Sequence, residues 1–334
     1  MRARCLTAVL AGVVLMLGAC SSPGPSRTKS QDVAPGPAPA AAPRGGSPGC
    51  GKPLPPTTEV SADRDGVRLR YRLNVPRGFT NATPAPVVLN FHGLGSNAFM
   101  QDVYSRLPLV GGERGFIVVT PSSSTGLPGW VLPGLKGEDV ADDGAEVKAA
   151  GLLLDHLEAT LCVDSGREFA TGMSNGAGMA SALVCGLRGR LAAVAPVSGV
   201  NIAEPCPNPR PTSIVAFHGT GDQVIPYDGG PVSVRANYSG VATPDWLRDL
   251  RLPSVVDTMD RWARSLGCGR PVQVRVAKDI RLRRYPGCRD GATVSLYTVR
   301  GGGHTWPGSL PFSRATTTSI DATDVMLTAF EKAS

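Results

Sequence analysis

The sequence has few histidines, few lysines and few aromatic residues. Four of its 334 residues are histidines, aromatic side chains make up 5%, and six lysines leave arginine to carry most of the net charge of +7. Long apolar runs are also missing, which excludes a buried transmembrane helix. A hydrophobic content of 42% excludes a wholly disordered chain and is enough for one large core. These limits predict a soluble globular domain.

Cysteines at metal-ligand spacing are missing as well. None of the eight cysteines forms a CxxC pair, and no cysteine lies in a cluster with histidine. We therefore expect no metal site, and the chemistry described below requires no metal or organic cofactor.

Much of the positive charge lies near the N-terminus. Residues 1–49 contribute +4 of the +7, from Arg2, Arg4, Arg27, Lys29 and Arg44 against Asp32. The remaining 285 residues carry only +3, so the basic balance is no argument for a nucleic-acid partner.

The same region has the layout of an export signal. Two arginines precede the apolar run Leu6 to Leu17, and Leu17-Gly18-Ala19-Cys20 resembles the lipobox of bacterial lipoproteins. We expect residues 1–19 to be a signal peptide and Cys20 to carry a lipid that anchors an exported protein to the membrane, facing outside. An ordinary cleaved signal with a chance cysteine, and a secreted product, is the alternative.

Residues 20–49 are expected to be a disordered tether. They consist mainly of proline, glycine, alanine and serine, and Val33 is their only large aliphatic residue. The folded domain is therefore predicted to span residues 50–334.

Six cysteines remain after Cys5 and Cys20 are assigned to the signal and the lipid. An even number in an exported domain predicts disulfides. Nearness in sequence favours Cys185 with Cys206 and Cys268 with Cys288, which leaves Cys50 for Cys162, although six cysteines allow about 15 pairings.

The domain alternates strand and helix patterns. Alternation from Val67 to Val75 behind the turn pair Asp65-Gly66 predicts an antiparallel strand. Helical spacing marks 147–161, behind the cap-like Asp143 and Glu146, and 254–267. Short apolar runs predict strands covered on both faces at Val87–Phe91, Phe116–Thr120, Glu168–Thr171, Ala192–Val197, Ile214–Phe217 and Val294–Val299. This pattern predicts an α/β fold with a mostly parallel central sheet and helices on both faces.

A serine stands at one strand-to-helix junction. The strand ending at Thr171 continues into Gly172-Met173-Ser174-Asn175-Gly176 and then a helix-compatible run, which is the context of a G-x-S-x-G nucleophile elbow. The glycines have a steric reason, because so tight a turn leaves no room for Cβ atoms beside the serine. A tight turn without chemistry is the alternative.

Partners for this serine follow in the order that α/β-hydrolases use, with an acid and then a histidine at strand ends. Asp222 follows the strand Ile214–Phe217, and His304 follows Val294–Val299. Asp228, six residues after Asp222, is the alternative acid. The loop His92-Gly93-Leu94-Gly95 follows the strand at Val87, where this fold places its second oxyanion donor, so Asn175 and Leu94 are predicted to supply the two N–H groups.

Four segments together resemble one family. FHGLGSN, GMSNGAGMA, HGTGDQVIPY and GGGHTWPG, in that order, resemble the secreted esterase and polyhydroxybutyrate depolymerase family of α/β-hydrolases, which includes feruloyl and acetylxylan-type esterases. The resemblance covers roughly residues 50–332. It implies an α/β-hydrolase fold and carboxylic ester hydrolysis, with the nucleophile at Ser174, the acid at Asp222 and the base at His304.

These residues predict a serine esterase acting on a small or polymeric ester, such as a hydroxybutyrate-type, feruloyl or acetyl ester. An acyltransferase with the same triad and a non-catalytic binding lipoprotein are the alternatives. Trp306 and Tyr227 are candidates to line the substrate pocket or merely to pack loops, and 229–253 is a candidate specificity loop. His92 and His218 are expected to support loops, and the basic run at 281–284 to form a hairpin edge.

Overall fold

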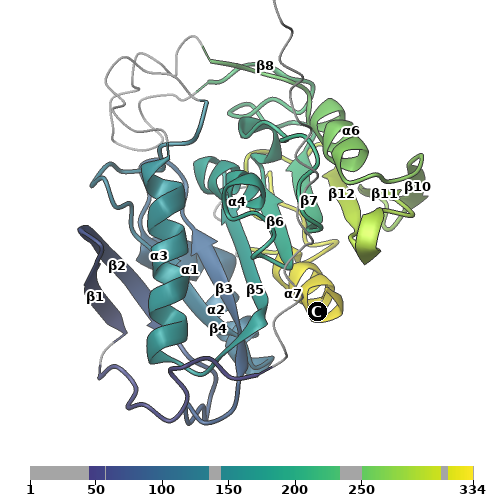
Figure 1. The fold of residues 1–334 in the computed structure, drawn as a ribbon. Coiled ribbons are helices and arrows are strands. Elements are labelled where there is room, and N and C mark those ends of the chain that lie inside the picture. The colour runs from purple at the N-terminus through teal and green to yellow at the C-terminus, as the bar shows by residue number, and fades with distance from the viewer. Residues whose placement is uncertain (1–44, 57, 135–143, 234–249, 310–314, 334) are drawn as a thin grey trace, which may run out of the picture. The chain divides into compact units, whose positions relative to one another are not determined.

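A ten-stranded sheet forms the centre of the computed structural model, which describes residues 45–56, 58–134, 144–233, 250–309 and 315–333 (Figure 1). The strand order is β1-β2-β4-β3-β5-β6-β7-β12-β11-β10. The strands are β1 (Glu59–Arg64), β2 (Val67–Asn74), β3 (Ala85–Phe91), β4 (Ile117–Pro121), β5 (Val163–Met173), β6 (Ala193–Val197), β7 (Ser213–Gly219), β10 (Val272–Arg275), β11 (Ile280–Tyr285) and β12 (Val294–Val299).

Parallel pairing joins the central strands from β4 to β12, and antiparallel pairs flank them at both ends. All seven residues of β3 and of β7 are buried, as their unbroken apolar runs predict. Two short strands, β8 (Gly230–Pro231) and β9 (Arg251–Leu252), pair separately. The predicted mostly parallel α/β sheet is therefore confirmed.

Helices cover both faces of this sheet. Helices α3 (Ala145–Thr160), α4 (Asn175–Gly186) and α6 (Val255–Ser265) belong to one apolar cluster with the sheet. On the other face α7 (Ala322–Lys332) contributes Met326, Leu327 and Phe330 to a second cluster, and α2 (Leu107–Glu113) contributes Leu107. Within the described residues, the remaining helical elements are α1 (Ala98–Ser105) and the short 3₁₀ turns η1 (Val200–Ile202) and η2 (Arg289–Gly291).

The two helices predicted by spacing are present, but one begins differently. Ser254 caps α6 as its sequence indicates, since its hydroxyl accepts from the Asp257 N–H. Gly144 occupies the cap position of α3 without a side-chain bond, and Glu146 is buried and accepts hydrogen bonds from Ser123, Ser124 and Thr125 instead. The predicted partner Asp143 lies outside the described residues.

The basic run at 281–284 lies in β11, which forms a hairpin with the edge strand β10. Arg283 within it donates to Asp260 of α6 at 2.8 Å. A hairpin at the end of the sheet is therefore confirmed, although β10 rather than β11 is the edge strand.

The predicted disulfides Cys50–Cys162, Cys185–Cys206 and Cys268–Cys288 are all present. Cys162 immediately precedes β5, Cys185 lies in the last turn of α4, and Cys288 precedes β12. Because α4 runs away from the carboxyl end of β5, all three bonds lie toward the amino ends of the parallel strands.

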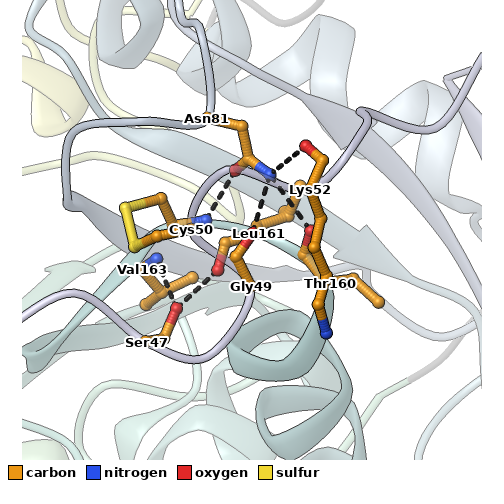
Figure 2. Close-up of a disulfide and its surroundings, with 9 residues drawn as sticks. Ser47, Gly49, Cys50, Lys52, Asn81, Thr160, Leu161 and Val163 are labelled. Carbon is orange, nitrogen blue, oxygen red and sulfur yellow. Dashed lines mark hydrogen bonds between the residues drawn. A yellow bond between two sulfur atoms is a disulfide. The ribbon is translucent and has the colours of Figure 1, made fainter.

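The predicted boundary at residue 50 is wrong by a few residues. Ser47 accepts from the Val163 N–H through its hydroxyl (Figure 2). Its backbone N–H donates to Val163 O at 3.1 Å, and Gly49 N–H donates to Glu158 O. Polar and small residues carry no apolar signal, so composition alone assigned this segment to the tether. Residues 1–44, with the predicted signal peptide, Cys20 and most of the tether, lie outside the described residues.

Candidate active site

Ser174 stands on a strained turn between β5 and α4. Its backbone has φ 57° and ψ −123°, and α4 begins at the next residue. A non-glycine residue in such a conformation is unfavourable and persists only where its surroundings fix it. Here the Ser174 N–H donates to Val197 O at 2.9 Å, and its carbonyl accepts from Ala177 and Gly178 in the first turn of α4.

The flanking glycines are required by close backbone contacts, as predicted. A Cβ on Gly172 would lie 2.5 Å from Gly176 O, and one on Gly176 would lie 2.2 Å from Phe91 O. Both distances are impossible for a methylene group. Any larger residue would therefore push the serine turn away from the end of β3.

Asp222 and His304 meet because β7 and β12 are parallel neighbours. The loop after β7 is bonded to the loop after β12 through Gly221 N–H and Gly302 O at 2.8 Å. His304 Nδ1 lies 2.8 Å from Asp222 Oδ2. Asp228, the alternative acid, is exposed in the same loop, so the structure brings Asp222 to this histidine.

The Asp222 carboxylate is buried and surrounded by donors. Its Oδ1 accepts from the N–H groups of Val224 and Ile225, both at 2.9 Å. Its Oδ2 faces His304 and also His218, whose Nε2 lies 3.3 Å away. Burial alone would raise the pKa of Asp222, but the hydrogen bonds and charges of the two histidines outweigh it and hold that pKa well below its usual range.

An ionised Asp222 fixes the tautomers of both histidines. A carboxylate only accepts hydrogen bonds, so His304 carries its proton on Nδ1 and leaves Nε2 free to accept one. His218 Nε2 also lies 2.9 Å from Ile225 O, a second acceptor, so it too carries a proton. The fully buried His218 was expected only to support a loop, and sequence reasoning missed its contact with the acid.

Ser174 and His304 are connected through the end of β6. Val197 accepts from the Ser174 N–H, and the next residue, Ser198, donates its hydroxyl to Thr305 O at 3.3 Å. Among the described residues, hydrogen bonds join His304 to Asp222 but do not join Ser174 Oγ to His304. Ser174 is partly exposed, and the His304 side chain is 10% exposed.

The predicted oxyanion residues lie beside the elbow. A Cβ on Gly93 would stand 3.4 Å from Ser174 Cβ, and the next residue is Leu94. Asn175 uses its side chain to hold Trp130, accepting from the Trp130 N–H at 2.6 Å and donating to its carbonyl at 3.0 Å. Its side chain is thus engaged, and within the described ranges the backbone N–H groups of Asn175 and Leu94 have no acceptor.

The two candidate pocket residues lie in different surroundings. Trp306 is fully buried, its Nε1 donates to Thr323 Oγ1 at 3.0 Å, and it packs in the α7 cluster. It therefore packs a loop, and the pocket-lining alternative is wrong because no surface is left for a ligand. Tyr227 is partly buried, with its hydroxyl 2.9 Å from Thr298 Oγ1 and its ring against His218; a substrate contact for it stays a prediction.

Two further histidines support structure rather than chemistry. His92 is 3% exposed, its ring packs on Trp130, and its carbonyl accepts from Trp130 Nε1 at 2.7 Å. Burial lowers the pKa of His92. His156 on α3 is partly buried with Nε2 3.1 Å from the Tyr71 hydroxyl.

Two kinds of feature are absent from the described part of the chain. No group of three or more potential metal-ligating side chains is present there. None of its helices is both long and apolar enough to cross a membrane. Residues 234–249, most of the predicted specificity loop at 229–253, lie outside it.

Comparison with known proteins identifies the family. Residues 69–258, more than half of the chain, match the family model described as esterase PHB depolymerase. Feruloyl esterase D of Neurospora crassa is 28% identical over 273 residues, which cover 80% of this chain and 84% of that protein. Probable feruloyl esterase C of Aspergillus terreus is 34% identical over 191 residues, covering 55% and 65%. Feruloyl esterase B of Piromyces equi is 28% identical over 238 residues, covering 69% of this chain but only 41% of that protein.

Solved structures support the fold. An acetyl xylan esterase from Aspergillus awamori aligns with a TM-score of 0.53 and 15% identity, covering 74% of this chain and 93% of that one. The apo form of Thermogutta terrifontis esterase 2 aligns with a TM-score of 0.52 and 14% identity, covering 84% and 96%. With the family match over the strands that carry the elbow and the acid, the chain belongs to the esterase PHB depolymerase family of α/β-hydrolases.

Proposed function

We propose that the chain is an exported serine esterase that hydrolyses carboxylic esters through Ser174, His304 and Asp222. The observation that carries the proposal is the 2.8 Å contact between His304 Nδ1 and the buried Asp222 carboxylate. It leaves an imidazole with a free Nε2 at the same sheet edge as a serine held on a strained elbow. An unfavourable backbone conformation reduces stability and is typical of active sites, so the strained turn at Ser174 supports a catalytic role.

In the proposed first half-reaction, His304 Nε2 takes the Ser174 hydroxyl proton while Oγ attacks the ester carbonyl. The tetrahedral oxyanion accepts hydrogen bonds from the backbone N–H groups of Asn175 and Leu94. Its collapse breaks the bond to the alcohol oxygen, and the imidazolium of His304 returns the proton to that oxygen. The alcohol leaves, and the acyl group remains on Ser174.

The second half-reaction repeats these steps with water. His304 removes a proton from water, the hydroxide attacks the acyl carbonyl, and the proton passes to Ser174 Oγ as the acid leaves. Asp222 stays ionised throughout and stabilises the imidazolium in both halves. The missing Ser174–His304 hydrogen bond fits a free enzyme, since such bonds often tighten only with substrate present.

The names of the relatives suggest candidate esters. Feruloyl esterases are among the similar sequences, and the family model names a polyhydroxybutyrate depolymerase. We extend to this chain only the ester class, with feruloyl, acetyl and hydroxybutyrate-type esters as candidate substrates. The chain spans 41% and 65% of the first two relatives, so their whole-protein activities enter only as candidates.

Export is supported by three disulfides, because such bonds persist in oxidising compartments. The N-terminal run and the lipobox-like Leu17-Gly18-Ala19-Cys20 support membrane anchoring through a lipid on Cys20. Metabolic labelling with a palmitate analogue tests this: incorporation should disappear in Cys20→Ser, and its persistence there would contradict the assignment.

The catalytic proposal is tested by hydrolysis of an ester panel that spans the three candidate classes. We expect Ser174→Ala to lower kcat by about 10⁴-fold or more on every ester that the wild type hydrolyses. Ser181→Ala is the matched control, since that hydroxyl lies in the same helix and donates to Ala177 O. Equal activity of Ser174→Ala and Ser181→Ala would contradict the proposal.

A further inference from the structure

The two edge strands of the ten-stranded sheet differ in how their outer edges are protected. The exposed side chains of β1 are Glu59, Ser61 and Asp63, and charged side chains on an edge strand oppose pairing with another chain. At the opposite end of the sheet, all four residues of β10 are exposed, and two of them are valines (Figure 1). Among the described residues β10 pairs only with β11, so its outer edge is open.

Valines line one face of β10 and continue into the turn that follows it. Val272, Val274 and Val276 are 48%, 44% and 48% exposed. Residues two positions apart in a strand point to the same face, so these three side chains form one row at the end of the sheet. An exposed apolar row on an open edge is a site of association with another strand.

This row of valines continues an apolar row that begins in the core. Residues opposite each other in neighbouring strands share a face. The pairing runs from β7 through β12 and β11 to β10, in the order Phe217, Tyr297, Leu282 and Val274. Phe217 is fully buried against the α7 cluster, whereas Leu282 and Tyr297 line an open groove of about 480 Å³. The row is therefore covered at β7 and uncovered at β10.

The open edge presents the backbone groups of two residues. Val276 N–H donates to Ile280 O at 3.1 Å, on the side of β11. Backbone groups along a strand face alternately toward and away from a given neighbour, so Val274 also faces β11. Gln273 and Arg275 therefore direct their N–H and C=O groups outward, and within the described residues no strand lies beyond them.

A second copy of β10 matches these outward groups in one antiparallel register. With Val274 opposite Val274 of the second copy, Gln273 lies opposite Arg275, and the outward N–H and C=O groups of both strands are all bonded. This register is symmetric about Val274, as the contact in a twofold dimer requires.

The two registers shifted by two residues are less favourable. One places Arg275 opposite Arg275 of the second copy, where the like charges repel each other. The other places Arg275 opposite Pro271, which has no N–H to donate. The backbone groups and the charges therefore select the same register.

We propose that the protein forms a twofold dimer in which two β10 strands pair antiparallel about Val274 and join the two sheets. The valine rows of the two copies then meet, with Leu282 and Tyr297 behind them, and form one apolar face across the interface. The inference does not depend on the proposed esterase function, because β10 carries none of the residues proposed for catalysis.

Analytical ultracentrifugation tests the dimer in the Cys20→Ser chain, in which no lipid on that residue can bring two copies together. We expect a concentration-dependent species of twice the monomer mass. Gln273→Pro removes one outward N–H from each copy and leaves the bonds of β10 to β11 in place, so the dissociation constant should rise about 10-fold or more. Gln273→Ala, which keeps the N–H, is the matched control and should dimerise like the parent chain.

Cysteine cross-linking tests the register in the same chain. In Val274→Cys the two cysteines face each other in a non-hydrogen-bonded pair with Cα atoms about 4.5 Å apart, so mild oxidation should give a reducible dimer. Val272→Cys is the matched control, because the two copies of this equally exposed position would lie about 14 Å apart, too far for a disulfide.

Three results would overturn the inference: a monomer at every concentration, a dimer that Gln273→Pro does not weaken, or equal cross-linking of Val272→Cys and Val274→Cys. Thermal melting shows whether each variant is folded, and the cross-linking pair tests the register even if Gln273→Pro unfolds. Failure of the esterase proposal looks different, since it would abolish ester hydrolysis and leave sedimentation and cross-linking as they are.

Discussion

Polar side chains are buried at both the carboxyl edge and the amino edge of the parallel strands, but they have different roles at the two edges. At the carboxyl edge four donors surround Asp222, and two of them, His304 and the buried His218, each keep one ring nitrogen without a partner among the described residues. At the amino edge Asn81, fully buried with φ 59°, accepts from Cys162 N–H and donates to the carbonyls of Gly49, Lys52 and Thr160 (Figure 2).

The two clusters therefore differ in what they leave unsatisfied. Asn81 bonds only to backbone groups beside the Cys50–Cys162 disulfide. These hydrogen bonds and the disulfide hold the chain against the domain at the point where the predicted tether ends. The cluster around Asp222 leaves two imidazole acceptors, the buried Nδ1 of His218 and the more exposed Nε2 of His304, and one partly exposed serine. A satisfied polar cluster stabilises the fold, whereas a cluster with an open position can take up a proton.

The largest effect should come from Asp222→Asn. The amide would favour the wrong tautomer of His304 and could not stabilise the imidazolium, so kcat should fall about 10⁴-fold. The measurement is steady-state hydrolysis of the best ester from the panel. Asp228→Asn is the control in the same loop, and a comparable loss there would contradict the assignment of the acid.

The loss of stability caused by Asp222→Asn should depend on pH. Because the pKa of Asp222 is lowered in the folded state, its ionised form stabilises the protein above the unfolded-state value of about 3.9. That contribution is lost as the pH falls below about 4. The difference in unfolding free energy between wild type and Asp222→Asn should therefore shrink in acid, as urea denaturation at several pH values would show.

The next effect concerns the amino edge. Replacing both Cys50 and Cys162 by serine removes a crosslink between residues 112 positions apart, and should lower the free energy of unfolding by about 4 kcal/mol. Since no catalytic group lies there, kcat/KM of the folded variant should not change. Urea denaturation and ester hydrolysis on the same preparation check both statements.

The matched control is Cys268→Ser/Cys288→Ser, which opens a separation of only 20 residues and should be less destabilising. A fall in kcat/KM with unchanged stability in Cys50→Ser/Cys162→Ser would contradict the proposal that the amino edge serves stability and the carboxyl edge serves catalysis.

The smallest effect is expected for His218→Asn, whose shorter side chain moves the N–H donor away from Asp222. Asp222 would keep three of its four donors, and its carboxylate would be held less firmly against His304 Nδ1. We therefore expect kcat/KM to fall about 10-fold. Tyr227→Phe, which removes the bond to Thr298 beside His218, is the control and should have a smaller effect.

Rescue separates positioning from packing in this experiment. The longer side chain of His218→Gln can keep an N–H donor near Asp222, so this variant should retain more kcat/KM than His218→Asn does. Equal losses of kcat/KM in the two variants would assign His218 a purely structural role.

The sequence predicts the central strands and the order of the site residues because both depend on local patterns. Unbroken apolar runs such as Val87–Phe91 form covered strands, and Gly172 and Gly176 mark a turn with no room for Cβ atoms. Disulfide pairing by nearness also succeeds. These features need only a few consecutive residues to be recognised.

Other features depend on partners far along the chain. Strand β1 has no fully buried residue and is held by pairing with β2. Helix α1 exposes Phe99 and Met100. Neither element was predicted, because neither separates apolar from polar residues clearly in the sequence. Trp306 packs on a C-terminal helix that was not predicted. Glu146 looks like a helix cap but anchors a loop more than twenty residues upstream.

The most direct test of the account is covalent labelling of the folded protein with a fluorophosphonate, followed by mass spectrometry of its peptides. A serine activated by His304 and Asp222 should give one adduct per chain, on the peptide containing Ser174, and the adduct should be absent in Ser174→Ala and strongly reduced in His304→Ala. A folded wild-type protein that does not react, or one labelled equally in Ser174→Ala, would contradict the claim that Ser174 is the nucleophile.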